Sequence, residues 1–369
     1  MWPNRRLIDL LGIKHPIVLS PMAGFGTVEL AAAVCDAGAL GSIGCGPTSP
    51  EVAARTIRQL RGLTSKLINV NFFCHVPADA TSGEEQGWRD RLSHYYRELG
   101  GDPQASSSRT DLPAFGNDMC SVVEQFRPEV VSFHFGLPAP SLLSRVKSAG
   151  CRVMSSATTV EEALWLEARG VDVIIAQGYE AGGHRATFLG PDVNRAMASQ
   201  SGMMVLLPQV VDAVRVPVIA AGGIADGRGI AAALMLGAAG AQIGTGYLLC
   251  PEAATPPLHR DALRRAAADA TVLTNVFTGR PARALVNRFI REVGPMADAA
   301  PAFPIPLAAS APLRILAEQR GSSDFTPLWA GQASRLGREM PAKALTASLV
   351  KETMQQFRRL SATAEELAV

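Results

Sequence analysis

Four residues with chemically versatile groups stand close together where one predicted strand ends. Gln177 follows the mostly apolar run 171–175, and Gly182, Gly183 and His184 come shortly after it. An amide both donates and accepts hydrogen bonds, glycine lets a backbone approach a ligand closely, and histidine exchanges protons near neutral pH. Because these residues gather where a buried strand passes into a loop, they indicate an active-site loop and not a packing element.

Two later strand ends are rich in glycine and have the pattern of an anion site. They comprise Gly222 and Gly223 after one apolar run, and Gln242, Ile243, Gly244 and Thr245 within the next. Backbone N–H groups that converge beside a helix N-terminus bind anions well. The pattern therefore predicts a phosphorylated cofactor; alternatively, the glycines serve only tight turns and close packing of helix on strand.

Two amides and two histidines have both a functional and a purely structural interpretation. Asn71 and Gln177 match the imide edge of a flavin or nucleobase, or else satisfy a neighbouring loop carbonyl. We expect His184 to be catalytic; the structural alternative is a hydrogen bond to a carboxylate such as Glu180. His134 ends the fourth predicted strand, and it either faces the same site or points into the sheet.

Eight short runs rich in apolar and β-branched residues alternate with helix-like segments. The runs cover residues 16–22, 39–44, 67–73, 130–135, 152–157, 171–178, 216–223 and 240–248. Gly38, Gly150 and Gly237 follow three of the helical segments and should have positive φ. Eightfold repetition of strand and helix predicts an α/β fold, a (β/α)8 TIM barrel whose site lies at the carboxyl ends of the strands.

Two long segments interrupt this alternation. We divide the chain into a cofactor-binding barrel (residues 1–73 and 119–250), an inserted lid (74–118), a substrate-side helical region (251–335) and a closing C-terminal helix (336–369). The lid and the substrate-side extension both leave from carboxyl ends of strands, so they are expected to cover the active site.

The lid segment contains an amphipathic helix and a stretch typical of mobile loops. Trp88, Tyr95 and Tyr96 lie on one side of the predicted helix. Residues 100–113 are rich in Gly, Ser and Pro, which is typical of flexible segments. We expect the helix and this stretch to cover the substrate together.

Charge, cysteine spacing and hydropathy exclude several classes of protein. A formal net charge of +2 gives no electrostatic case for nucleic acid. The 6 cysteines form no C-x-x-C pair and no metal-like spacing, which predicts reduced thiols and no metal site. Residues 1–10 lack the apolar core of an export signal, and glycine interrupts the apolar stretches. We therefore expect no membrane span and a cytoplasmic location.

Taken together, these segments resemble the nitronate monooxygenases, formerly called 2-nitropropane dioxygenases. The resemblance covers about residues 5–345 and is most specific in Glu-Ala-Gly-Gly-His-Arg at 180–185 and His-Phe-Gly-Leu-Pro at 134–138. Further matching stretches are 21–24, 69–75, 220–228, 242–245 and 327–332. The resemblance implies non-covalent FMN and the oxidation of alkyl nitronates, such as propionate 3-nitronate, by dioxygen to a carbonyl compound and nitrite.

The resemblance also assigns roles to residues. It implies His184 as the active-site histidine, and His134 stays a second catalytic candidate. The residues expected to hold FMN are Met22, Ala23, Asn71, Gln177, Gly182, Gly183, Gly222, Gly223, Gln242, Ile243, Gly244 and Thr245. The chain departs from the family pattern at Ala186, where we expect glycine, and at Phe303, where we expect a tyrosine facing the substrate.

Two other functions share parts of this pattern. An FMN-dependent NAD(P)H:quinone or enoyl-thioester reductase on the same barrel would have the same glycine motifs. A non-redox barrel that acts on a sugar phosphate is disfavoured, because no lysine stands at the strand ends for a Schiff base. We therefore expect a nitronate and dioxygen as small-molecule partners, and a homodimer is among the assemblies that the sequence allows.

Overall fold

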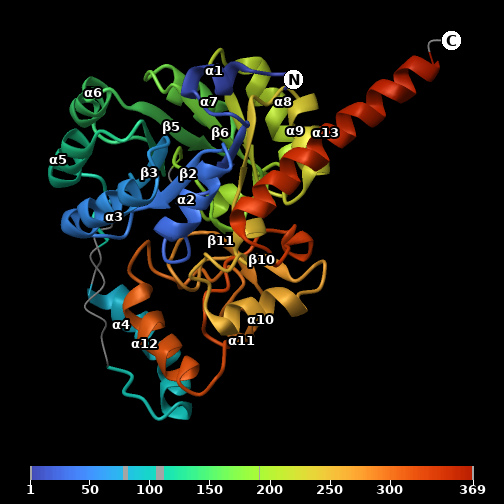
Figure 1. The fold of residues 1–369 in the computed structure, drawn as a ribbon. Helices are drawn as coiled ribbons and strands as arrows, with labels where there is room; N and C mark the ends of the chain where they lie inside the picture. The colour runs from blue at the N-terminus through green and yellow to red at the C-terminus, as the bar shows by residue number, and fades with distance from the viewer. Residues whose placement is uncertain (1, 78–81, 105–111, 191, 368–369) are drawn as a thin grey trace.

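A parallel barrel of eight strands forms the centre of the computed structural model, which describes residues 2–77, 82–104, 112–190 and 192–367 (Figure 1). The strands are β1 (Ile17–Leu19), β2 (Gly41–Gly44), β3 (Ile68–Phe73), β4 (Val130–His134), β5 (Arg152–Ala157), β6 (Val173–Gln177), β8 (Val218–Ala221) and β9 (Gly240–Ile243). Their order is β1-β9-β8-β6-β5-β4-β3-β2. Leu40 closes the barrel by donating to Ile17 O at 3.0 Å and accepting from Leu19 N at 2.9 Å. Each predicted run contains one strand, so the TIM-barrel prediction is confirmed.

Helices cover the outer face of the barrel. They are α2 (Val28–Asp36), α3 (Pro50–Leu63), α5 (Asn117–Phe126), α6 (Pro140–Ser148), α7 (Val160–Glu167), α8 (Met203–Ala213) and α9 (Gly227–Met235). The short helix α1 (Arg6–Leu11) precedes β1, and the 3-10 helix η1 (Arg195–Ser199) precedes α8. The last helix, α13 (Ala342–Leu367), packs against α9 and α2 and thereby takes the place of the helix after β9. Gly38, Gly150 and Gly237 have φ of 88°, 90° and 96°, as predicted for helix ends.

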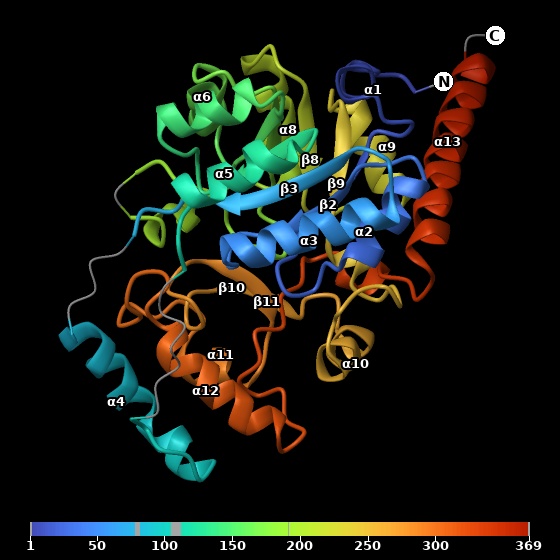
Figure 2. The ribbon, with the colours of Figure 1, turned by 60° about the vertical axis from the view of Figure 1, so that its left-hand side comes forward.

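The extension between β9 and α13 lies against the carboxyl ends of the strands (Figure 2). It contains η2 (Thr245–Tyr247), α10 (Pro257–Arg265), β10 (Thr271–Thr274), β11 (Ala282–Leu285), α11 (Arg288–Val293), α12 (Leu307–Glu318) and η3 (Ser334–Leu336). β11 pairs antiparallel with β10 and with β7 (Gly183–His184), from the loop after β6. This three-stranded sheet was not expected from the sequence, which predicted helices and turns here. It fastens His184 to the extension.

The helix predicted in the lid is α4 (Ser82–Glu98), and it lies against α12 (Figure 2). Trp88, Tyr95 and Tyr96 are buried there, and the Tyr96 hydroxyl donates to the carbonyl of Ala309 in α12. A cavity lies at the carboxyl ends of the barrel strands, and no described residue of α4 lines it, whereas four residues of α12 do. The helix therefore supports α12 and does not itself contact a ligand in the cavity.

The Gly/Ser/Pro-rich stretch 100–113 is described only in part. Its residues 105–111 lie outside the described residues, so the predicted mobility is not addressed. Leu112, at the far side of this gap, lines the cavity, and its carbonyl lies 2.9 Å from His75 Nε2.

Within the described part of the chain, no helix combines the length and apolar character needed to cross a membrane. In the same residues, His, Cys, Asp and Glu side chains form no group that could hold a metal ion.

Candidate active site

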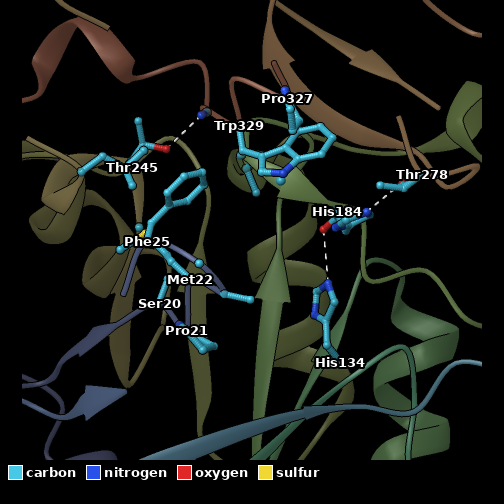
Figure 3. A pocket seen from close by; sticks show the side chains of 18 of the residues that line it. Ser20, Pro21, Met22, Phe25, His134, His184, Thr245, Thr278, Pro327 and Trp329 are labelled. Atoms are coloured by element: carbon cyan, nitrogen blue, oxygen red, sulfur yellow. Dashed lines mark hydrogen bonds between the residues drawn. The ribbon is translucent and has the colours of Figure 1, made fainter. Parts of the chain in front are cut away.

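A cavity of about 450 Å³ lies between the carboxyl ends of the barrel strands and the extension (Figure 3). The first βα loop contributes Met22 and Ala23 to its wall. The extension contributes Thr278, Phe303 and Trp329. A concave site of this size, at this end of a barrel, is the place where such folds bind small molecules.

All but one of the predicted site residues line this cavity, and Ile243 is the exception. Its side chain is only 1% exposed and belongs to the apolar core. Successive side chains of a strand point to opposite faces, so Gln242 and Gly244 face the cavity while Ile243 turns away. The backbone of Ile243 still holds the first loop, because its carbonyl accepts from Ser20 N at 2.8 Å.

Glycine-rich loops present free backbone donors at one side of the cavity. Gly222 and Gly223 have φ of 108° and 71°, conformations that side chains disfavour. The N–H groups of Gly223, Gly244 and Thr245 donate to no described residue, although all three residues line the cavity. Converging donors of this kind suit an anion such as a phosphate.

The N-terminus of α9, in contrast, is already capped by the chain. Asp226 accepts from Arg228 N at 2.9 Å and from Gly229 N at 3.2 Å. Glu352 of α13 accepts from Gly227 N at 3.1 Å. The sequence suggested that this helix end would help to bind an anion, but only the loop N–H groups are available for it.

Gly182 permits a close backbone contact between the barrel loop and the extension. A Cβ atom there would lie 2.5 Å from Gly331 N, closer than side chains tolerate. Gly331 N donates to Thr245 Oγ1 at 2.9 Å, which ties the extension to the strand end at β9. Gly331 lies in the stretch 327–332 that matches the family pattern, but its contacts with Gly182 and Thr245 could not be predicted because these partners are remote in sequence.

The side-chain amides of Gln177, Asn71 and Gln242 line the cavity and differ in which of their atoms already form hydrogen bonds within the protein. Gln177 Nε2 donates to His184 O at 3.0 Å, and Gln177 Oε1 accepts from Ala186 N at 2.9 Å. Asn71 Nδ2 donates to Ser132 O at 3.1 Å and Ser132 Oγ at 2.9 Å. Gln242 Oε1 is buried without a partner. Gln177 therefore has the loop-holding role that the sequence left open, and Gln242 keeps an acceptor available.

His184 lies in a ring of aromatic residues at the cavity wall. Its Nε2 is 2.9 Å from Thr278 Oγ1, and its Nδ1 has no partner among the described residues (Figure 3). The rings of Trp329, Phe303 and Phe135 lie 5.4, 5.7 and 6.0 Å from its centroid. Glu180 does not bind this imidazole, since its carboxylate accepts from Met203 N at 2.9 Å.

His134 lines the same cavity, which answers the question left by strand alternation. Its Nε2 lies 3.3 Å from His184 O and its Nδ1 lies 3.4 Å from Ser156 Oγ (Figure 3). The His134 side chain thus supports the backbone of the loop that carries His184.

The imidazoles of His134 and His184 are uncharged at pH 7, and the positive charge of Arg280 lies near both of them. Burial above all, then the neighbouring His134 and Arg280, lowers the pKa of His184 to about 3. Burial, followed by Arg280, likewise lowers the pKa of His134 to about 3. Arg280 is buried, its carbon Cζ lies 4.0 Å from the centroid of the Phe135 ring, and it has no ion pair with a described carboxylate. An anion placed beside these residues would offset a buried positive charge.

These two lowered pKa values predict a loss of stability in acid. The unfolded chain binds protons at histidine below about pH 6.5, whereas the folded chain binds them only near pH 3, so stability falls as the pH drops between these values. Each histidine contributes at most about 2 kcal/mol to this loss between pH 7 and 5. Urea unfolding of the H134N/H184N double variant should show a shallower pH dependence than the wild type.

The matched control for this measurement is His94→Asn, because His94 is exposed on α4. The unfolding free energy of this variant should depend on pH as that of the wild type does, since His134 and His184 remain in both proteins. A double variant with the slope of the wild type would show that the two site histidines are as easily protonated in the folded chain as in the unfolded one.

Sequence reasoning found the strand ends and, through the family pattern, Phe303 and the stretch 327–332 that contains Trp329, but it missed Thr278 and Arg280. These two residues lie far from His184 in the chain and carry no local motif. The two departures from the family pattern both fit the structure. Phe303 lines the cavity beside His184, and Ala186 is fully buried with its N–H bound to Gln177.

Comparison with known proteins agrees with this architecture along nearly the whole chain. Residues 4–352 match the family model described as nitronate monooxygenase. A nitronate monooxygenase of Paraburkholderia phytofirmans is 42% identical over 97% of this chain and 97% of its own. One of Pseudomonas aeruginosa is 42% identical over 94% of this chain and 98% of its own. The crystal structure of nitroalkane oxidase from Streptomyces ansochromogenes superposes with a TM-score of 0.88 at 38% identity, covering 96% of this chain and 99% of that one. The chain therefore belongs to the nitronate monooxygenase family, a family of enzymes.

Proposed function

We propose that the protein oxidises alkyl nitronates with dioxygen to a carbonyl compound and nitrite, with FMN as its cofactor. The family is generally flavin-dependent, which supports a flavin here. The observation that carries the proposal is the juxtaposition, in one cavity, of free backbone donors with a neutral imidazole next to a buried cation.

The residues of the cavity fit FMN. A phosphate would be held by the free N–H groups of Gly223, Gly244 and Thr245, because nothing described competes for them. The orphaned Oε1 of Gln242 would accept a hydrogen bond from the flavin ring. Met22, Ala23 and Asn71 would complete the wall around it. When bound, FMN supplies the electron-transfer chemistry that side chains lack.

The chain itself would hold and orient the nitronate. Thr278 would fix the imidazole of His184 by donating its hydroxyl hydrogen to Nε2, so that the single proton of the neutral ring is on Nδ1 and is available to the nitronate oxygens. Arg280 does not itself line the cavity, but its buried positive charge near His184 would favour an anion there. Phe303 and Trp329 exclude water, which strengthens these electrostatic contacts.

Preformed nitronates are the expected substrates, more than neutral nitroalkanes. With a pKa of about 3, His184 is a poor proton acceptor, so removal of the α-proton of a nitroalkane would be slow. A nitronate is already an anion and needs only a hydrogen bond and a positive surrounding.

The proposal predicts a yellow protein that releases FMN. After heat denaturation, chromatography of the supernatant should yield FMN and not FAD, since the free donors suit a terminal monophosphate. In the absence of air, propionate 3-nitronate should reduce the bound flavin rapidly, and NADH should do so slowly or not at all.

Other outcomes of these two measurements would each reject a different part of the proposal. Stoichiometric FAD would reject the assignment of the phosphate site. Rapid bleaching by NADH together with no response to the nitronate would instead favour the NAD(P)H-dependent reductase.

A further inference from the structure

One face of α12 forms part of the cavity wall and carries a charged side chain. Leu307, Ser310, Ala311 and Arg314 all line the cavity, and their spacing places them on one side of the helix. The opposite side of α12 packs against α4, where Leu313 is buried. The helix is therefore held by α4 in an orientation that keeps Arg314 at the cavity.

The guanidinium of Arg314 donates no hydrogen bond to a described residue. Its Nε is buried without a hydrogen-bond partner, although the side chain as a whole is 39% exposed. It forms a long ion pair with Glu318, whose Oε1 lies 3.7 Å from that nitrogen, too far for a hydrogen bond. The same Oε1 already accepts from Thr326 Oγ1 at 2.8 Å. A planar fork of donors thus remains available for a carboxylate.

Arg314 is also unusual in charge. Among the described residues that line the cavity, it is the only one with a formally charged side chain. It is not one of the residues whose rings or hydroxyl groups contact His184. A ligand group bound by Arg314 would consequently differ from the group bound at His184.

We propose that Arg314 forms a subsite for a second anionic group of the substrate, so that the enzyme prefers nitronates that also carry a carboxylate. This inference rests on the proposed function. The arginine selects because a carboxylate gains a charge-assisted hydrogen bond there, whereas an alkyl group gains none and leaves the arginine with only its long ion pair to Glu318.

Two nitronates that differ at one group test the subsite. Propionate 3-nitronate and propyl 1-nitronate share a three-carbon skeleton, with a carboxylate in one where the other has a methyl group. In the FMN-loaded enzyme, Arg314→Met should lower kcat/KM about 10- to 100-fold for propionate 3-nitronate, the range expected for one charge-assisted hydrogen bond. The value for propyl 1-nitronate should stay within about 3-fold.

Three controls complete the experiment. Arg314→Lys keeps the charge and should retain part of the preference. Arg320→Met removes an exposed cation just after α12, outside the cavity, and should leave kcat/KM unchanged for both nitronates. Added salt should weaken the reaction of propionate 3-nitronate, a dianion, more than that of propyl 1-nitronate, a monoanion. Equal losses for both nitronates, or no loss for either, would overturn the subsite while leaving the proposed function intact.

A binding measurement keeps the inference testable even if neither nitronate is oxidised. Calorimetric titration of the loaded wild type with 3-nitropropionate and 1-nitropropane should show tighter binding of the first. Arg314→Met should abolish that difference. An unchanged difference would refute the subsite whatever reaction the protein catalyses.

Discussion

Replacement of His184 by phenylalanine should lower kcat/KM for ethyl nitronate by about 10²- to 10³-fold, the usual effect of losing one preorganised hydrogen-bond donor. Phenylalanine keeps the aromatic packing with Trp329 and Phe303 but can neither donate nor accept. Oxygen uptake by the purified variant, at several nitronate concentrations, gives the measurement.

The variant should retain its fold and its flavin, because His184 is held by its backbone. Its carbonyl accepts from Gln177, and β7 pairs with β11. His184→Asn should recover part of the activity, since an amide can donate to the nitronate. The activity of Thr278→Val should lie between those of the two His184 variants, because the imidazole remains present but loses the one hydrogen-bond partner that it has among the described residues. A yellow H184F protein with undiminished activity would mean that the histidine is structural.

The barrel could be predicted because its signals are local. Each strand is a short apolar run, and glycines at helix ends, such as Gly38 and Gly150, have the predicted positive φ. Such features depend on a few neighbouring residues, so they are visible in the sequence. The three-stranded sheet is different, because β7 and β11 are short and lie far apart in the chain. No periodicity of either segment indicates the pairing.

The candidate site was predictable to the same extent. Strand ends such as Asn71, Gln177 and Gly244 were found because they follow apolar runs. Thr278 and Arg280 were missed, since their importance comes from three-dimensional proximity to His184 alone. The electrostatic state of His184 also depends on burial and on this arginine. The sequence therefore suggested an imidazole that exchanges protons near neutral pH, whereas the lowered pKa in the structure makes it a poor proton acceptor.

Hydrogen-bond accounting decided between alternatives that sequence alone left open. Gln177 had two readings, and the bonds from its amide to the backbone of His184 and from Ala186 support the structural one. Gln242 was expected only as one of several cofactor-binding residues, yet its side-chain carbonyl oxygen is the buried atom left without a hydrogen-bond partner. Residue type and position therefore identified amides that line the cavity, but not which of their atoms are already bound by the protein.

Gly223→Val should yield a folded but nearly colourless protein, with the Kd for FMN raised about 100-fold or more through lost contacts to the phosphate. Gly223 has φ of 71°, which a β-branched residue strongly disfavours, and its free N–H is one of the proposed phosphate donors. The new side chain would also meet Glu180, whose Cβ lies 3.3 Å from the position of the added atom. Flavin fluorescence titration of the apo protein measures the affinity.

Gly321→Val separates the loss of the phosphate site from backbone strain. Gly321 has the same φ of 71°, but it is exposed, does not line the cavity, and an added Cβ would meet nothing within 4 Å. Both variants should lose about 1–3 kcal/mol of unfolding free energy in the apo form, because both force valine into a left-handed conformation. Only the change at Gly223 should weaken FMN binding. If both variants bind FMN like the wild type, the flavin phosphate is not held at this loop; if both lose it equally, strain alone explains the effect.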